Sequence, residues 1–285
     1  GLAGWRNLGL LREQVEEFHP TMVFCQDSTN GASFPEFSGA TNTPMEEMAC
    51  HPKVDLVVVA TVGTSGLLPT LAALSAGKAV ALASKETIVM AGALIAQKVS
   101  ESGTILPVDS EPSAIWQCLQ GDNQDVSRLI ITASGGAFRD RPWEDVASVT
   151  PEQALRHPTW SMGKKITVDS ATLMNKAFEV MEAHWLFDVP WDRIDVVLHP
   201  QSIVHSLVEF NDGSVKAQLA RPDMRLPLQY ALFYPRRMAN QWALSLDIAK
   251  LGSLDFGPLD NKRYPGFNIA LDAAREGGTY PAALC

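Results

Sequence analysis

Residues 54–85, VDLVVVATVGTSGLLPTLAALSAGKAVALASK, decide the fold. A first apolar run turns at glycines into a helix predicted over residues 67–76, and a second apolar run, AVALAS, leads into a longer helix predicted over residues 86–102. Uninterrupted Val, Ala and Leu strands that alternate with helices are typical of a parallel sheet that is covered on both faces and joined by right-handed crossovers. The first part of the chain is therefore predicted to be an α/β layer of the nucleotide-binding kind.

The pattern changes near Leu106. Strands are predicted over residues 104–110 and 128–136, helices over residues 113–119 and 171–187, and a hairpin around Asn211-Asp212-Gly213. This mixture predicts a second domain of the α+β class. We expect the first domain at residues 1–106, the second at 107–235, a loop-like linker at 236–262 and a last segment at 263–285, with a helical pattern from about Asn268.

Composition limits the classes of function. The 285 residues allow one large or two ordinary domains, and 23 basic against 32 acidic side chains give a formal charge of −9. Interspersed charges of this sign argue against a nucleic-acid partner, which needs a basic face. The apolar stretches are far shorter than the ~20 residues of a membrane span, and the first residues lack the features of a secretory signal. Four cysteines without a CxxC pair favour a reducing, cytoplasmic location.

Two carboxylates at the end of a predicted strand suggest a metal site. In PVDSE, residues 107–111, strand alternation would direct Asp109 and Glu111 to one face and Ser110 to the other. Hard divalent cations such as Mg²⁺ or Mn²⁺ prefer such oxygen ligands, and a third carboxylate would complete the site. The alternative is structural, because Asp, Ser or Glu before Pro112 also suits the start of a helix.

A second polar group follows in KKITVDSATLMNKAFEVMEAHWLF, residues 164–187, where a strand-like run meets a helix. Apolar residues at helical spacing form the predicted core stripe, whereas Asn175, Glu179 and Glu182 line another face beside Lys176. Ser170 and Asn175, near the start of the helix, would suit a phosphate. A solvated helix face would look similar, so this alternative stays open.

Other segments could hold an anion or close over a substrate. Ser134, followed by two glycines, offers a hydroxyl and free backbone amides, which suit an anion nest or an ordinary tight turn. Trp160, in the polar loop RHPTWSMGKK, is either a lid or the plug of a small core. Lys85 follows a parallel strand at its carboxyl end, where ligands of open α/β sheets bind. The GTSG turn at residues 63–66 is a weak candidate for a dinucleotide phosphate loop, because plain strand-to-helix connections look the same.

Together with AGWRN, LASKE, ILPVDSE, TASGGAFRD, HPQSIVHS, PDMRLP and RYPGF, these segments resemble, over essentially the whole chain, the 1-deoxy-D-xylulose 5-phosphate reductoisomerase family. The resemblance implies an α/β fold with a truncated Rossmann-like NADPH-binding domain, an α+β catalytic domain with a mixed sheet, and the incomplete start of a C-terminal helical domain at residues 263–285. The family's opening glycine-rich loop is not among these residues, so we expect the 285-residue chain to bind NADPH weakly or not at all. Pro112 stands where the family commonly has a histidine.

The resemblance also implies the residues of an active site. Its metal ligands fall on Asp109, Glu111 and Glu179, which form the catalytic set together with Lys85. Its substrate contacts fall on Lys85, Ser110, Ser134, His157, Trp160 in the lid, Ser170, Asn175 and Lys176. Its cofactor contacts fall on Arg6, Asn7, Ser84, Glu86, Gly163 and Met224.

The implied reaction depends on NADPH and on Mn²⁺ or Mg²⁺. It rearranges and reduces 1-deoxy-D-xylulose 5-phosphate, a small phosphorylated sugar, to 2-C-methyl-D-erythritol 4-phosphate in the non-mevalonate isoprenoid pathway. The resemblance further implies a homodimer in the bacterial cytoplasm, or in the plastid if the source is a plant. Two alternatives stay open: an oxidoreductase of the homoserine-dehydrogenase type, and a fragment that binds metal or phosphosugar without catalysis.

Overall fold

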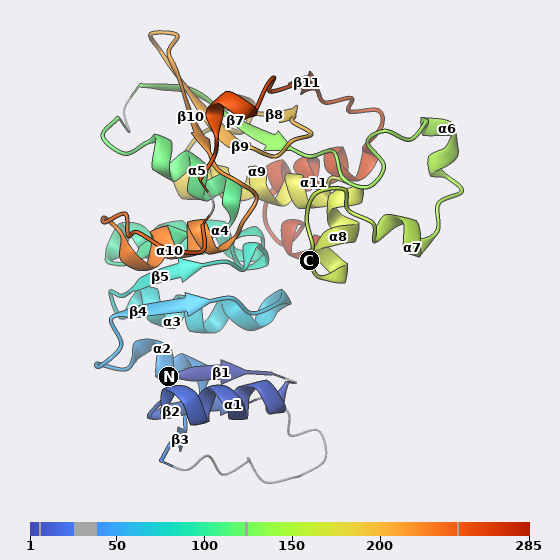
Figure 1. Ribbon diagram of the computed structural model, residues 1–285. Helices are drawn as coiled ribbons and strands as arrows, with labels where there is room; N and C mark the ends of the chain where they lie inside the picture. The colour runs from blue at the N-terminus through green and yellow to red at the C-terminus, as the bar shows by residue number, and fades with distance from the viewer. Residues whose placement is uncertain (6, 26–38, 123–124, 244) are drawn as a thin grey trace.

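The computed structural model describes residues 1–5, 7–25, 39–122, 125–243 and 245–285. Three sheets organise them: two short parallel sheets in the N-terminal part and one mixed sheet after residue 125. Figure 1 shows the two parallel sheets one above the other, with the mixed sheet at the far end of the molecule. In the described parts of the chain, none of the helices is long and apolar enough to cross a bilayer.

The first sheet contains strands that the sequence did not reveal. Its parallel strands run in the order β1 (Leu2–Gly4), β2 (Met22–Cys25) and β3 (Thr41–Asn42), with helices α1 (Leu8–Phe18) and α2 (Met45–Cys50) between and after them. Leu11 and Val15 of α1 pack against Val23 of β2 in a small core. Strands of two to four residues are too short for a period of two to be recognised.

The second sheet confirms the parallel layer predicted from residues 54–85. Its strands run in the order β4 (Leu56–Val59), β5 (Ala79–Leu82) and β6 (Thr104–Pro107). The connections are a short turn of helix at Gly63–Gly66, α3 (Leu67–Ser75) and α4 (Lys85–Glu101), which is kinked at Ala91. Apolar side chains of β5, α3 and α4, including Val80, Leu74 and Ile88, form one core.

An open groove of about 670 Å³ separates the two parallel sheets. Among the described residues, β1 and β4 are each the terminal strand of their sheet, and both line this groove together with side chains of α2. Figure 1 shows β4 above β1 with these edges toward each other.

The third sheet is mixed, as predicted, with the order β10-β9-β7-β8-β11. Only β7 and β8 pair in parallel, and the turn around Asp212 joins β9 and β10 as the predicted hairpin. The elements of this part are α5 (Ser110–Cys118), β7 (Val126–Ala133), α6 (Trp143–Val146), α7 (Pro151–Ala154), α8 (Lys164–Ala171), α9 (Met174–Phe187), β8 (Ile194–Leu198), β9 (Val204–Phe210), β10 (Val215–Leu219), α10 (Arg225–Phe233), β11 (Gly257–Pro258) and α11 (Pro265–Glu276).

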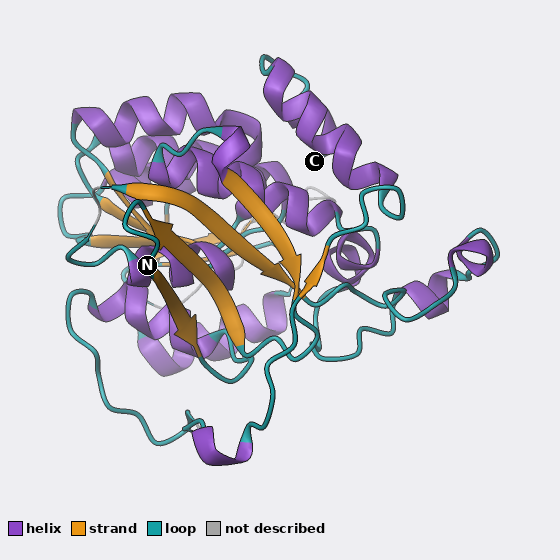
Figure 2. Ribbon diagram, turned by 90° about the horizontal axis from the view of Figure 1, so that it is seen from above, coloured by secondary structure: helices purple, strands orange, loops and turns teal. Residues whose placement is uncertain are grey.

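The largest core lies between the mixed sheet and helices α5, α9 and α11, whose ribbons Figures 1 and 2 show from two directions. Phe178 and Met181 of α9 lie at its centre, in agreement with the predicted stripe. In both views the segment with α6 and α7 extends away from the body. The final helix begins at Pro265, three residues before the predicted start, because proline suits the first turn of a helix.

Residues 164–171 form α8, so the prediction of a strand-like run there was wrong. The β-branched residues that suggested a strand belong to a helix in which Thr167, Ser170 and Ala171 are buried at helical spacing. Thr167 Oγ1 donates a hydrogen bond to Gly163 O at 2.8 Å, which accommodates this residue type in a helix. Tertiary packing therefore overrides the local strand preference.

The extended conformation predicted for PVDSE was also wrong. β6 ends at Pro107, and Asp109 is the N-cap of α5, where its side chain accepts a hydrogen bond from Ser110 N at 3.1 Å. Ser110 and Glu111 thus lie in the first helical turn rather than on alternating faces of a strand. The helix-cap alternative describes the local backbone, although it leaves the use of the two carboxylates open.

Candidate active site

A polar pocket of about 350 Å³ lies where β5, β6 and β7 end. It is smaller than the groove beside β1, but its walls carry the charged and hydroxyl-bearing side chains that the sequence singled out. Those residues are Lys85, Asp109, Ser110, Glu111, Ser134, His157, Trp160, Ser170, Asn175, Lys176, Glu179 and Met224. The fold thus gathers into one cavity every residue expected to act in catalysis or substrate binding, from segments far apart in the sequence.

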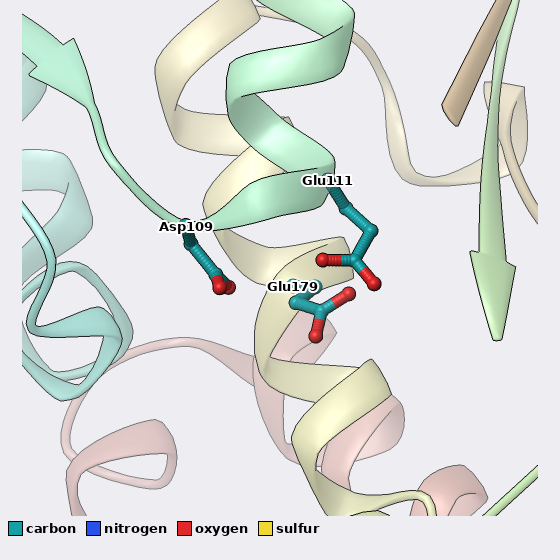
Figure 3. Close-up of side chains that lie close together, drawn as sticks. All are labelled: Asp109, Glu111 and Glu179. Carbon is teal, nitrogen blue, oxygen red and sulfur yellow. The ribbon is translucent and has the colours of Figure 1, made fainter. Parts of the chain in front are cut away.

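Three carboxylates converge in this pocket. Asp109 and Glu111 belong to the start of α5, and Glu179 comes from the middle of α9. One oxygen atom of each lies within 4.8 Å of the others, and Figure 3 shows the three side chains pointing toward one another. Asp109 and Glu179 are buried, and Glu111 is partly buried, so little water is available to screen their repulsion.

Two buried lysines balance these charges. Lys85 Nζ lies 2.7 Å from Asp109 Oδ2 and 3.3 Å from Glu179 Oε1. Lys176 Nζ lies 2.7 Å from Glu111 Oε1 and also contacts Glu179 Oε2. Lys85 is the first residue of α4, where a positive charge interacts unfavourably with the helix dipole. The neighbouring carboxylates offset this unfavourable interaction.

Hydrogen bonds fix the same side chains in place. Asn175 donates through Nδ2 to Glu179 Oε1 at 2.6 Å, and its Oδ1 accepts from Lys85 Nζ at 2.6 Å. Ser110 Oγ donates to Glu111 Oε2 at 2.6 Å. The carboxylates are therefore oriented by partners from α4, α5 and α9.

The buried acidic groups in this region differ in the direction of their pKa shifts. Burial and the neighbouring Glu111 raise the pKa of Glu179 to about 7. Burial, followed by the charge of Asp109, raises the pKa of Glu182 well above its usual range. Burial works in the same direction on Asp109, but the Lys85 ammonium outweighs it and lowers the pKa of that carboxyl. A site in which one carboxylate is charged and its neighbours hold protons readily is suited to exchanging protons for a cation.

Serine hydroxyl groups also line the pocket. Gly136 has φ +68°, and a side chain there would place its Cβ 2.3 Å from Ser170 O, so only glycine allows the loop after β7 to approach α8 this closely. This approach brings Ser134 and Ser170 to the same cavity. Trp160 reaches the pocket from the loop before α8, with its ring centroid 6.4 Å from that of His205.

The residues expected to bind the cofactor are more scattered. Of these, Met224 alone lines the polar pocket among those the structure describes, while Arg6 lies outside the described residues. Asn7 is exposed and caps α1 by accepting from Leu10 N at 3.1 Å. Ser84 is buried and accepts from Thr87 Oγ1 at 3.3 Å. Glu86 forms an ion pair with Lys165 at 3.3 Å, and Gly163 is the exposed N-cap of α8.

Several pocket residues had no individual role in the sequence analysis, and Ser202 and His205 are two polar ones among them. Ser202, at φ +52°, and the buried His205 line the pocket from the segment before and at the start of β9. His199 holds this segment, because its Nε2 accepts hydrogen bonds from Ile203 N and Val204 N, each at 3.1 Å. Both Ser202 and His205 belong to HPQSIVHS, so the available signal was that motif itself.

Comparison with known proteins gives a consistent result. The family model for 1-deoxy-D-xylulose 5-phosphate reductoisomerase matches residues 1–92, the model for its C-terminal domain matches residues 105–187, and the model for the DXP reductoisomerase C-terminal domain matches residues 219–285. The 1-deoxy-D-xylulose 5-phosphate reductoisomerase of Thermomicrobium roseum is 50% identical over 288 residues, covering 100% of this chain and 74% of the relative. That of Geobacillus kaustophilus is 50% identical over 287 residues, covering 98% and 75%.

Solved structures show the same relationship. A DOX-P reductoisomerase in complex with NADPH, fosmidomycin and magnesium superposes with a TM-score of 0.87 at 40% identity, covering 96% of this chain and 72% of that one. The enzyme of Zymomonas mobilis in complex with NADPH gives a TM-score of 0.87 at 38% identity, covering 98% and 74%.

Proposed function

The chain belongs to the 1-deoxy-D-xylulose 5-phosphate reductoisomerase family, an NADPH-dependent class of enzyme, and from this premise we propose how the polar pocket carries the reaction. The function is the rearrangement and reduction of 1-deoxy-D-xylulose 5-phosphate to 2-C-methyl-D-erythritol 4-phosphate. The homoserine-dehydrogenase alternative is not favoured by these relatives.

Asp109, Glu111 and Glu179 would hold the divalent cation. Their donor set fits Mg²⁺ or Mn²⁺, because it consists of hard oxygens within 4.8 Å of one another and leaves the pocket side open to substrate oxygens. When bound, the cation supplies Lewis-acid stabilisation of negative charge on the substrate's carbonyl oxygen. Ser110 and Asn175 would keep the carboxylates oriented through the hydrogen bonds described above.

The serine hydroxyls and neighbouring donors of the pocket would bind the substrate's phosphate. Ser134, Ser170, Asn175 and Lys176 offer hydrogen-bond donors there, and His157 lies beside Ser134. Because the phosphate takes no part in the rearrangement, its binding energy can be used to position the reacting atoms and to close the Trp160 loop over them. Exclusion of water by that loop would protect the aldehyde formed between the two steps.

Lys85 would act on the substrate itself. Its ammonium is held at the boundary between the carboxylates and the cavity by Asp109 and Asn175. From there it can stabilise negative charge that develops on a substrate hydroxyl or carbonyl oxygen. The same position explains why a lysine, rather than a neutral donor, follows β5.

The nicotinamide cofactor would approach from the N-terminal sheets. Met224 at the edge of the pocket would contact its nicotinamide end, and Ser84, Glu86 and Gly163 lie on the elements that border this approach. Asn7, with Arg6, would contact the cofactor farther from the reacting atoms.

We also infer a homodimer formed through the mixed sheet. β10 is a terminal strand of that sheet within the described residues, and it leaves side chains such as Val215 exposed. The unpaired backbone groups of such an edge can pair with a strand of a second molecule. Sedimentation that shows only monomer at tens of micromolar would contradict this inference.

The observation that carries the proposed function is the convergence of Asp109, Glu111 and Glu179 beside two lysines and a set of hydroxyls. Oxidation of NADPH on addition of 1-deoxy-D-xylulose 5-phosphate and Mn²⁺, followed at its near-ultraviolet absorbance, tests it. We expect turnover that is abolished by a chelator and by Glu179→Gln, but not by Glu101→Gln at the exposed end of α4. Binding of Mn²⁺ and phosphate without any turnover would instead favour the non-catalytic alternative.

A further inference from the structure

The bonding of His157 determines which of its ring nitrogens carries the proton. Nδ1 accepts hydrogen bonds from two backbone N–H groups, Thr159 N at 3.1 Å and Trp160 N at 2.9 Å. A nitrogen that accepts hydrogen bonds must present a lone pair, so Nδ1 is unprotonated and the proton of the neutral ring resides on Nε2. The ring thereby replaces the side-chain oxygen of Asn or Asp that usually closes such a turn.

This tautomer assigns the direction of the bond to Ser134. His157 Nε2 lies 3.0 Å from Ser134 Oγ, and since Nε2 carries the proton, the histidine donates and the serine accepts. Ser134 Oγ also accepts from Gly136 N at 3.3 Å. With both acceptor positions in use, the hydroxyl proton of Ser134 is the part left to point into the pocket.

We propose that His157 is a positioning residue that couples the closed turn at Thr159 and Trp160 to the orientation of the Ser134 hydroxyl. Formation of the turn fixes the tautomer, the tautomer makes Ser134 an acceptor toward His157, and Ser134 then presents its proton to an acceptor oxygen in the pocket. The inference rests on the proposed function in one respect, that this acceptor is the substrate's phosphate. It gives the Trp160 loop and the anion site a shared hydrogen-bond chain rather than two separate roles.

The same arrangement excludes a second use of the pair. A serine nucleophile needs a histidine nitrogen with a free lone pair to take its proton. His157 Nε2 has no lone pair available while Nδ1 accepts from the turn. Ser134 and His157 therefore form a binding arrangement and not a nucleophile with its base.

The surroundings keep the ring neutral. Burial, followed by the positive charge of Arg139, lowers the pKa of His157. Two hydrogen bonds hold the Arg139 guanidinium in place, because its Nη1 donates to Ser134 O at 3.0 Å and to Pro200 O at 3.2 Å. A protonated ring would place an N–H on Nδ1 against two backbone N–H groups, which would open the turn.

Two substitutions each remove one part of this hydrogen-bond chain: either the bonds from the turn to Nδ1 or the bond from Nε2 to Ser134. His157→Asn retains an acceptor at the position of Nδ1 but has no atom that reaches Ser134. His157→Gln retains a donor with the reach of Nε2 but lacks the acceptor that closes the turn. Both are compared with the unchanged chain in three measurements: the tautomer by ¹⁵N NMR of labelled histidine rings, the rate of tryptic cleavage at Arg156 and Lys164, and the affinity for inorganic phosphate by calorimetry.

We expect the unchanged chain to show a His157 ring with its proton on Nε2. His157→Asn should keep the loop resistant to trypsin and bind phosphate about tenfold more weakly, whereas His157→Gln should be cleaved several times faster and lose less phosphate affinity. A ring with its proton on Nδ1, or equal losses of protection and affinity in both variants, would overturn the coupling. The tautomer is measured without any substitution, so a variant that does not fold leaves the inference testable.

The outcomes also distinguish this inference from the proposed function. If the tautomer and the cleavage rates are as expected but phosphate does not bind, the coupling stands and the assignment of the anion fails. If phosphate binds with the other tautomer, the anion site stands and the coupling fails.

Discussion

Lys176 Nζ lies 2.7 Å from Glu111 Oε1, a contact that joins α9 to the first turn of α5 across 65 positions of the chain. The same ammonium contacts Glu179, a second carboxylate of the proposed metal site, and Lys176 lines the cavity together with Ser134 and Ser170. One buried cation is thus shared between the groups proposed to bind a metal and those proposed to bind a phosphate.

Lys176→Ala should therefore change the two affinities in opposite directions. Affinity for a phosphate-bearing substrate analogue should fall by about 1.5–3 kcal/mol, the range for a hydrogen bond to a charged group. Affinity for Mn²⁺ should rise, because a positive charge that competes for Glu111 and Glu179 is removed. Calorimetric titration measures both, with an analogue lacking the phosphate and Lys98→Ala, at a partly exposed position outside the pocket, as controls. Equal losses for both analogues would show that Lys176 supports the fold instead.

Glu179→Gln should remove most Mn²⁺ binding and leave the fold intact. The substitution keeps the shape of the side chain but takes away one of three carboxylates whose oxygens lie within 4.8 Å of one another. Titration in Mg²⁺-free buffer, followed by electron paramagnetic resonance, should show one site in the unchanged chain and a large loss in the variant, with Glu101→Gln as the control on an exposed position. Unchanged affinity would mean that Asp109 and Glu111 serve only the start of α5.

Metal affinity should depend on pH around neutrality. Burial and Glu111 raise the pKa of Glu179 to about 7, and a cation binds only the ionised carboxylate, so Mn²⁺ affinity should fall about tenfold between pH 8 and pH 6. Calorimetry in buffers of different ionisation enthalpy should detect the proton released. A flat profile over this range would contradict the raised pKa.

Ionisation of Glu179 should also make the stability of the metal-free fold depend on pH. The direction is opposite to that of metal affinity, because stability should decrease as the pH rises. The folded chain holds a proton on Glu179 that the unfolded chain has already lost, so this contribution is complete below the ordinary pKa of glutamate and disappears as the pH rises through about 7. Thermal unfolding in a chelator at pH 5.5 and 7.5, compared with that of Glu179→Gln, should show a larger loss of stability at the higher pH in the unchanged chain than in the variant. The comparison cancels the other groups that titrate in this range.

Gly92→Ala should destabilise the contact between α4 and α9. A Cβ at position 92 would lie 2.2 Å from Trp185 Cδ1, just beyond the kink of α4 at Ala91. Overpacking of this kind costs about 1–3 kcal/mol. Gly9→Ala is the matched control, because its Cβ would meet nothing closer than 3.8 Å on α1 and should stabilise that helix by about 0.5–1 kcal/mol. Chemical denaturation measures both, and a neutral Gly92→Ala would show that the Trp185 ring can move aside.

The sequence predicted which residues form the site more accurately than it predicted how those residues are arranged. The long apolar runs around Val57 and Val80 predicted the parallel layer, because strands buried on both faces need no alternation to be recognised. Asp109 and Glu111 were identified for a wrong reason, strand alternation, and still meet Glu179 because α5 starts where α9 passes beneath it. Their meeting depends on the packing of two helices distant in sequence, which no local pattern encodes. The pairing of Lys85 and Lys176 with these carboxylates has the same origin.

We expect the groove between β1 and β4 to give this chain a route to uncontrolled self-association. Each strand presents backbone donors and acceptors to the groove, and Val58 of β4 is exposed. An extended segment from another molecule could pair with either edge, and because the two partners would use different surfaces, the process need not stop at two copies. Turbidity that increases with concentration, and that a short Val-rich peptide suppresses, would reveal such polymers and separate them from the proposed closed dimer.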